Sequence, residues 1–257
     1  MTRQLVLAHF SVRHASFPDR CAAARDAGFD GIGLYVGEYS RQRSAGLGDA
    51  DLLGILAEHD TAVLELEALP FFADAHLDTF VHLVATFGAK RIQVIPPFSG
   101  AVDRDEAATW LGTFADRVAP FGASLAIEFL PFTDVPDAAT AAEIVDRAGR
   151  ANLGLCVDSW HVFRGEGLLS LVGLDPSIVV NVQCNDGPAE PVLDDYVQDC
   201  LHHREVPGEG EFDLRSFFDL LPADAPVSVE VPDDDLDDLP TRQAALLLAT
   251  ETRRYLD

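Results

Sequence analysis

The sequence predicts an α/β fold, a single (β/α)8 TIM barrel domain spanning residues 1–257. Apolar, β-branched segments alternate with helical patterns along the chain, and eight such strand segments can be counted. The 257 residues, 48% of them hydrophobic, are enough for one large core. Neither GxGxxG nor GxxxxGKS/T occurs, so the glycine-rich turn typical of a doubly wound nucleotide-binding sheet is missing.

The predicted strands are short runs rich in Val, Ile, Leu and aromatic residues, the composition favoured in strands. In chain order they are residues 4–10, 31–37, 62–69, 91–98, 124–132, 153–160, 178–186 and 227–232.

The clearest helical segments are residues 18–29, 74–89, 105–122 and 240–256. Residues 74–89 and 105–122 place apolar residues three and four positions apart. Residues 18–29 have Pro near the start and Gly near the end, and residues 240–256 end in arginines that favour the helix dipole. One long stretch, residues 187–212, is predicted to be irregular, and loops of that length inside compact domains are usually functional.

The composition excludes several functions. Lys and Arg number 18 against 43 acidic residues, so a formal charge of −25 disfavours nucleic acid and anionic membranes as partners. No stretch approaches the roughly 18 apolar residues of a membrane helix, and the N-terminal segment lacks a signal-peptide pattern. We therefore expect a cytoplasmic protein without a nucleic-acid or membrane partner, and a homo-oligomer is possible.

Polar side chains interrupt four apolar strands near their C-terminal ends, where barrel enzymes carry their chemistry. Glu128 follows SLAI, Asp158 follows GLCV, Gln183 follows VVNV and Glu230 follows VSV. A single buried carboxylate is most often a hydrogen-bonded or salt-bridged core group. Three in one cavity repel one another and would either be protonated or recruit a cation, and oxygen ligands suit Mn²⁺ or Mg²⁺, with Co²⁺ or Zn²⁺ possible.

Two further residues are candidates for the same pocket. His9 lies near the end of the first predicted strand, and Glu67 near the end of the third. Alternatively, His9 is a core histidine whose ring nitrogens are hydrogen-bonded, and Glu67 is a buried carboxylate paired with a neighbouring group.

The segments SLAIEFLPF, GLCVDSWHVFRG, NVQCNDGP, REVPGEGEFD and VSVEV together resemble the sugar phosphate isomerase/epimerase family of the xylose-isomerase-like TIM barrel superfamily. The resemblance implies one divalent metal held by Glu128, Asp158, the residue at position 183 and Glu230. The family has histidine where this chain has Gln183, whose amide oxygen can still be a ligand. The resemblance also implies that His161 and Arg204 bind substrate; a core-capping histidine and an ion-paired arginine are the alternatives.

By resemblance, Glu128 and Glu230 are the catalytic acid–base pair. The leading hypothesis is a metal-dependent isomerase or epimerase that moves a proton next to the carbonyl of a carbohydrate-like small molecule. The alternative is a lyase or dehydratase on the same site, eliminating a group from a keto-sugar, oxidised glycoside or related compound. A nuclease is disfavoured by the net charge of −25 and by the small number of histidines at the strand ends. A non-catalytic binding protein would be expected to have lost metal-ligand residues, whereas three of the four expected positions are intact.

Overall fold

A computed structural model describes residues 3–256 of the chain; residues 1–2 and 257, the ends of the predicted domain, lie outside the described residues. The described residues form a closed barrel of eight parallel strands in the order β1 to β8, which confirms the predicted fold class. The strands are β1 (Leu5–Leu7), β2 (Gly31–Tyr35), β3 (Val63–Pro70), β4 (Arg91–Ile95), β5 (Ser124–Glu128), β6 (Leu153–Asp158), β7 (Val179–Cys184) and β8 (Val227–Val229).

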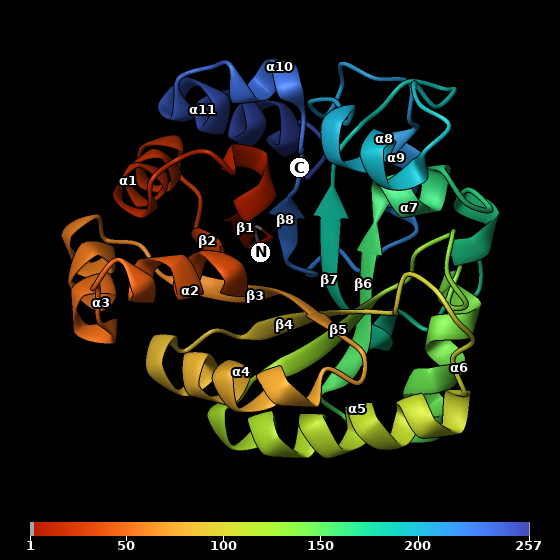
Figure 1. The fold of residues 1–257 in the computed structure, drawn as a ribbon. Coiled ribbons are helices and arrows are strands. Elements are labelled where there is room, and N and C mark those ends of the chain that lie inside the picture. The colour runs from red at the N-terminus through yellow and green to blue at the C-terminus, as the bar shows by residue number, and fades with distance from the viewer. Residues whose placement is uncertain (1–2, 257) are drawn as a thin grey trace.

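Helices surround these strands (Figure 1). They are α1 (Phe17–Ala27), α2 (Val36–Ser44), α3 (Asp49–Glu58), α4 (Asp74–Phe87), α5 (Arg104–Val118), α6 (Ala138–Ala148), α7 (Ser159–Phe163), α8 (Tyr196–His202), α9 (Leu214–Asp219), α10 (Asp234–Asp237) and α11 (Thr241–Arg253). A single apolar core joins the outward faces of the strands to the helices, with residues such as Leu66, Ile92 and Phe80 fully or almost fully buried.

All eight predicted strands exist, but most end earlier than predicted. The first was expected to run to residue 10, whereas β1 stops at Leu7 and residues His9–Val12 form a short 3-10 helix. Residues 187–212 were predicted to be irregular, and this is wrong in part because the segment contains α8. Asp195 caps α8 by accepting hydrogen bonds from the backbone N–H groups of Val197 and Gln198. In Figure 1, α8 lies beyond the arrowhead of β7.

The interior of the barrel is polar. Glu65 on β3 accepts a hydrogen bond from Asn181 on β7 at 3.2 Å and another from Ser228 on β8. Arg91 on β4 lies 3.6 Å from the Glu65 carboxylate. Because β3 and β7 are not neighbours in the barrel, these contacts cross its centre. This buried network is a hydrogen-bonded floor below the C-terminal ends of the strands.

Among the described residues, no helix is long and apolar enough to cross a membrane.

Candidate active site

The four predicted strand-end residues come from four consecutive strands. Glu128 and Asp158 are the last residues of β5 and β6, Gln183 is the penultimate residue of β7, and Glu230 directly follows β8. All four side chains are buried. The parallel register places Gln183 opposite Asp158 on one side and Ser228 on the other, so the four residues share one edge of the barrel.

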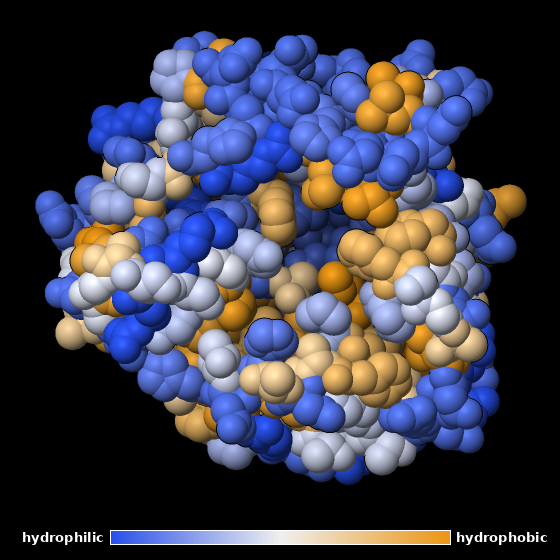
Figure 2. Space-filling view, in the orientation of Figure 1, coloured by the Kyte–Doolittle hydropathy of each residue, from blue (hydrophilic) through white to orange (hydrophobic). Residues whose placement is uncertain are grey.

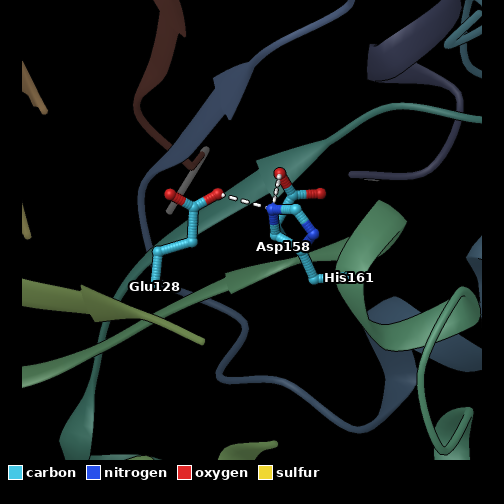
Figure 3. A group of neighbouring side chains, drawn as sticks. All are labelled: Glu128, Asp158 and His161. Carbon is cyan, nitrogen blue, oxygen red and sulfur yellow. Dashed lines mark hydrogen bonds and ion pairs between the residues drawn. The ribbon is translucent and has the colours of Figure 1, made fainter. Parts of the chain in front are cut away.

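Glu128, Asp158 and His161 form a compact group, in which one potential ligand atom from each residue lies within 4.8 Å of the others. Figure 3 shows the His161 imidazole directed toward both carboxylates. His161 Nε2 lies 2.9 Å from Glu128 Oε1 and 3.8 Å from Asp158 Oδ2. The short helix α7 explains this approach, because it begins right after β6 and returns His161 over the strand end.

A tyrosine on α8 contacts the other side of the imidazole. The Tyr196 hydroxyl lies 2.7 Å from His161 Nδ1, and the two rings are stacked with centroids 6.0 Å apart. Burial raises the pKa of Tyr196, so the hydroxyl keeps its proton at neutral pH. Tyr196 therefore fixes the orientation of the His161 ring through Nδ1 while Nε2 faces Glu128.

Asp158 is fully buried and has partners on both oxygens. Its Oδ1 accepts hydrogen bonds from the Trp160 backbone N–H at 2.7 Å and from Asn185 Nδ2 at 2.8 Å, and Oδ2 accepts from Arg204 Nη1 at 2.8 Å. Burial opposes the charged form, but the charges of Arg204 and His161 and the hydrogen bonds from Asn185 and Arg204 outweigh it and lower the pKa of Asp158.

Arg204 links two of the predicted ligands. Its Nη1 donates to Asp158 and, at 3.3 Å, to Glu230 Oε2, while Nη2 donates to Cys200 Sγ at 3.0 Å. The pKa of Glu230 is raised well above its ordinary value, first by burial and then by the charges of Glu128, Glu67 and Asp158, although Arg204 opposes the shift. Arg204 is thus an internal counter-ion for this part of the site.

A glutamine on β4 connects Glu128 to Gln183. Gln93 Nε2 donates a hydrogen bond to Glu128 Oε2 and lies 3.5 Å from Gln183 Oε1. Gln183 Oε1 also accepts a hydrogen bond from Cys156 Sγ at 3.2 Å. Glu128 is therefore held from both sides, by Gln93 at one oxygen and by His161 at the other.

His9 and Glu67 lie next to the pocket rather than among the residues that line it. His9 follows β1 in the 3-10 helix and contacts Arg20 and Glu38, with Nδ1 3.3 Å from Glu38 Oε2. The His9 backbone N–H donates to Glu67 Oε1 at 3.0 Å. Burial and the neighbouring Glu65 raise the pKa of Glu67 to about 8. Both residues thus have partners in the core, and their role in substrate binding stays a prediction.

The C-terminal edge of the barrel opens into a pocket of about 340 Å³. Glu128, His161, Arg204 and Glu230 line it, whereas Asp158 and Gln183 lie beneath these side chains. Figure 2 shows the hollow in the middle of this face, with hydrophilic atoms in its depth and hydrophobic residues around its mouth. The pocket thus combines acid–base groups at the bottom with apolar walls.

The donor set fits a divalent cation. Carboxylates dominate it, and His161 adds one nitrogen. Burial, together with the neighbouring carboxylates, raises the pKa of Glu230, and a cation would relieve the excess of negative charge at these groups. Arg204 already relieves part of this imbalance at Asp158 and Glu230. A cation at these two carboxylates would therefore share them with the guanidinium.

Sequence reasoning missed Tyr196 and Asn185, and it did not anticipate that Gln93 supports Glu128. Tyr196 lies in a segment without strand or helix periodicity, so no pattern linked it to His161. Asn185 follows β7 within NVQCNDGP, where only Gln183 was singled out, although its amide is within reach of Asp158.

Residues 21–251 match the xylose isomerase-like TIM barrel family, and the chain belongs to this family. The resemblance found in the strand-end segments is thereby confirmed at the level of the superfamily.

Two curated proteins are similar to parts of the chain. The 3-dehydroshikimate dehydratase of Pseudomonas aeruginosa is 32% identical over 158 residues, 57% of this chain and 25% of that protein. The inosose isomerase of Bacillus velezensis is 26% identical over 190 residues, 67% of this chain and 66% of that protein. The matches thus span about a quarter and just under two thirds of these relatives.

Among solved structures, the crystal structure of IOLI protein with a binding zinc atom superimposes with a TM-score of 0.87 at 22% identity. The match covers 100% of this chain and 98% of that one. At this identity the likeness shows the fold alone.

Proposed function

We propose that this chain is a divalent-metal-dependent enzyme that moves a proton next to the carbonyl group of a small, polyhydroxylated, sugar-like substrate. The observation that carries the proposal is that Glu128, His161 and Glu230 line one pocket of a closed barrel, with the Asp158 carboxylate grouped with Glu128 and His161 beneath it. Perturbed, mutually repelling carboxylates in a cleft are typical of proton-transfer sites.

The ligands we assign to the metal are Glu128, Asp158, Gln183 and Glu230. His161 Nε2 is near enough to the first two to complete the set in place of Gln183. Mn²⁺ or Mg²⁺ suits the oxygen-rich set, and a nitrogen ligand would favour Zn²⁺ or Co²⁺. When bound, such a cation polarises a carbonyl group and stabilises negative charge on its oxygen.

The residues that line the pocket supply the proton transfer. Glu128 and Glu230 approach from β5 and from the end of β8, so a substrate between them meets a carboxyl group on each side. His161 and Gln93 hold the two Glu128 oxygens in place, which fixes the direction from which that carboxylate can take a proton. Arg204 donates hydrogen bonds at the pocket floor, where substrate oxygens would lie.

The final product depends on where the proton returns. Return to the opposite face gives epimerisation and return to the neighbouring carbon gives isomerisation, which we take as the leading activity. Departure of a hydroxyl group gives dehydration instead. The 32% identity to a dehydratase specifically favours this second candidate, whereas the similarity to an inosose isomerase favours the first.

Solvent exchange tests the step that both outcomes share. The Mn²⁺-loaded protein is incubated in deuterium oxide with a panel of ketoses, inososes, 3-dehydroshikimate and the oxidised glycoside phenyl 3-keto-β-D-glucopyranoside, and proton NMR follows both exchange and product. We expect exchange next to the carbonyl of at least one compound, and the product then separates isomerisation from dehydration.

Glu128→Gln keeps the size of the side chain and should slow this exchange at least about 100-fold. Glu143→Gln on the exposed face of α6 is the matched control and should leave the rate unchanged. Equal exchange rates for the two variants would contradict the role of Glu128, and no exchange with any compound would contradict the proposed reaction.

A further inference from the structure

The walls of the pocket carry two aromatic clusters. Phe10 follows β1 and Tyr35 is the last residue of β2, and their ring centroids are 5.3 Å apart. Phe98 and Phe132 follow β4 and β5 with centroids 5.3 Å apart, and Phe132 lies 5.0 Å from Tyr196 on α8. All five rings line the same pocket as Glu128 and Glu230.

The barrel topology separates the two clusters. In a ring of eight strands β1 and β5 are opposite each other, so the Phe10 cluster and the Phe132 cluster approach the pocket from opposite sides. The hydrophobic residues around the hollow in Figure 2 agree with walls of this kind. We call the space between these five rings the aromatic slot.

Part of the aromatic slot is exposed to solvent, whereas the rings of a core cluster are buried. Phe98 is 55% exposed, although burying a phenylalanine side chain is strongly favourable. Arg204 is the one arginine or lysine among the described lining residues, and two carboxylates already share it. A phosphate group at these walls would therefore meet aromatic rings rather than cations.

We propose that the substrate of this enzyme carries a flat apolar group, such as an aromatic ring, which binds in the aromatic slot while its hydroxylated end faces Glu128 and Glu230. This inference rests on the proposed function and narrows its substrate class. The slot is continuous with the acid–base groups within one pocket of about 340 Å³, a size within the usual range of small-molecule sites. Offset and edge-to-face contacts with the five rings would stabilise such a group.

A pair of glycosides tests the slot without any reaction. Phenyl β-D-glucopyranoside and methyl β-D-glucopyranoside share the sugar and differ in the apolar group, and neither has a free carbonyl. Isothermal titration calorimetry on the Mn²⁺-loaded protein measures both dissociation constants. We expect the phenyl compound to bind at least about tenfold more tightly than the methyl compound.

Two variants and one control assign the preference to the slot. Phe98→Ala and Phe132→Ala should each reduce the phenyl preference by about threefold or more, and they should leave methyl glucoside binding unchanged. Phe121→Ala removes another exposed ring, 40% exposed and away from the pocket, and should have no effect.

Equal affinities, no detectable binding of either glycoside, or a phenyl preference that survives both variants would overturn the inference. Equal affinities would indicate that the five aromatic rings contact the sugar rather than the apolar group of the ligand. A phenyl preference without solvent exchange in any keto compound would instead leave the slot intact and refute the proposed reaction, so the two failures can be distinguished.

Discussion

Arg204 determines the charge balance of the site at the level of single residues. Its guanidinium is almost completely buried and donates to both Asp158 and Glu230. Breaking a buried ion pair from one side leaves an uncompensated charge, which costs far more than the loss of an exposed pair.

We therefore expect Arg204→Met to lower the free energy of unfolding of the metal-free protein by about 3–5 kcal/mol. Mn²⁺ should then raise the melting temperature of the variant more than that of the wild type, because both carboxylates become available to the cation. Thermal unfolding with EDTA and with Mn²⁺ measures both effects.

Arg150→Met is the control for this experiment, since Arg150 pairs with Asp116 at the surface. That variant should unfold like the wild type in EDTA and respond to Mn²⁺ like the wild type, because an exposed ion pair adds little to stability. An identical metal response in Arg204→Met would show that Arg204 and the cation do not share these carboxylates.

The residues at strand ends were partly predictable from the sequence. Glu128, Asp158, Gln183 and Glu230 stand out because each interrupts an apolar run that is expected to be buried on both faces. The ion pairs of Arg204 with Asp158 and Glu230 could not be predicted, because they depend on how the segment after α8 returns across the barrel. The metal-binding and catalytic roles of these residues stay predictions.

At the level of elements, α8 is the clearest departure from the predicted pattern. It has seven residues, too few for an apolar periodicity to be recognised, and its first residue is Tyr196. The helix begins at an Asp195 cap and places the Tyr196 hydroxyl on His161 Nδ1. A segment predicted to be irregular thus positions a residue of the site.

Tyr196→Phe removes only the hydroxyl contact to His161 Nδ1 and retains the stacked ring. We expect proton exchange to slow by about tenfold or more, with a shifted pH–rate profile, because the imidazole loses the partner that fixes its orientation. The exchange assay at several pH values measures both. An unchanged pH profile would indicate that Tyr196 merely packs against the ring.

Close contact between strands constrains β6 at Gly154. A Cβ atom at this position would lie 2.1 Å from the Ile178 carbonyl oxygen and 2.6 Å from Val180, so a side chain requires the backbone to move. Gly54 in the middle of α3 has no heavy atom within 4 Å of the corresponding position.

Gly154→Ala and Gly54→Ala are therefore expected to have opposite effects. The first should destabilise the protein by more than about 2 kcal/mol, whereas the second should stabilise it by about 0.5–1 kcal/mol because alanine is the better helix former. Urea unfolding measures both. A neutral Gly154→Ala variant would mean that β6 and β7 separate more easily than their register indicates.

At the level of the whole molecule, the barrel carries polar groups through its centre. Glu65, Glu67, Gln93, Asn181 and Ser228 all lie inside, where burial favours the neutral form of a carboxyl group. The pKa of Glu67 is raised to about 8, so the folded protein holds a proton that the unfolded chain releases near pH 4.5. Because the folded state then binds more protons, Glu67 makes stability fall as pH rises from about 4.5 to 8.

Glu67→Gln removes this titration. Between pH 5 and pH 8 the free energy of unfolding should fall less in the variant than in the wild type, by on the order of 1 kcal/mol or more. Urea unfolding in EDTA at both pH values tests this, with Glu190→Gln in the exposed loop as the control. A pH dependence identical to wild type would contradict a raised pKa at Glu67.

The fold as a whole was predictable because it repeats one unit eight times, and an error in the boundary of one strand leaves the count unchanged. The polar interior was less predictable, since strand alternation reveals a polar residue but not its partner across the barrel. Glu65 and Asn181 show this limit, because 116 residues separate them in the chain and one hydrogen bond joins them.

The Arg204 bridge has a consequence for how the protein matures. Since the chain brings its own cation to Asp158 and Glu230, a newly synthesised barrel can close without waiting for an ion from its surroundings. Loading with the proposed metal would then be a late and reversible event, governed by supply rather than by the completion of folding.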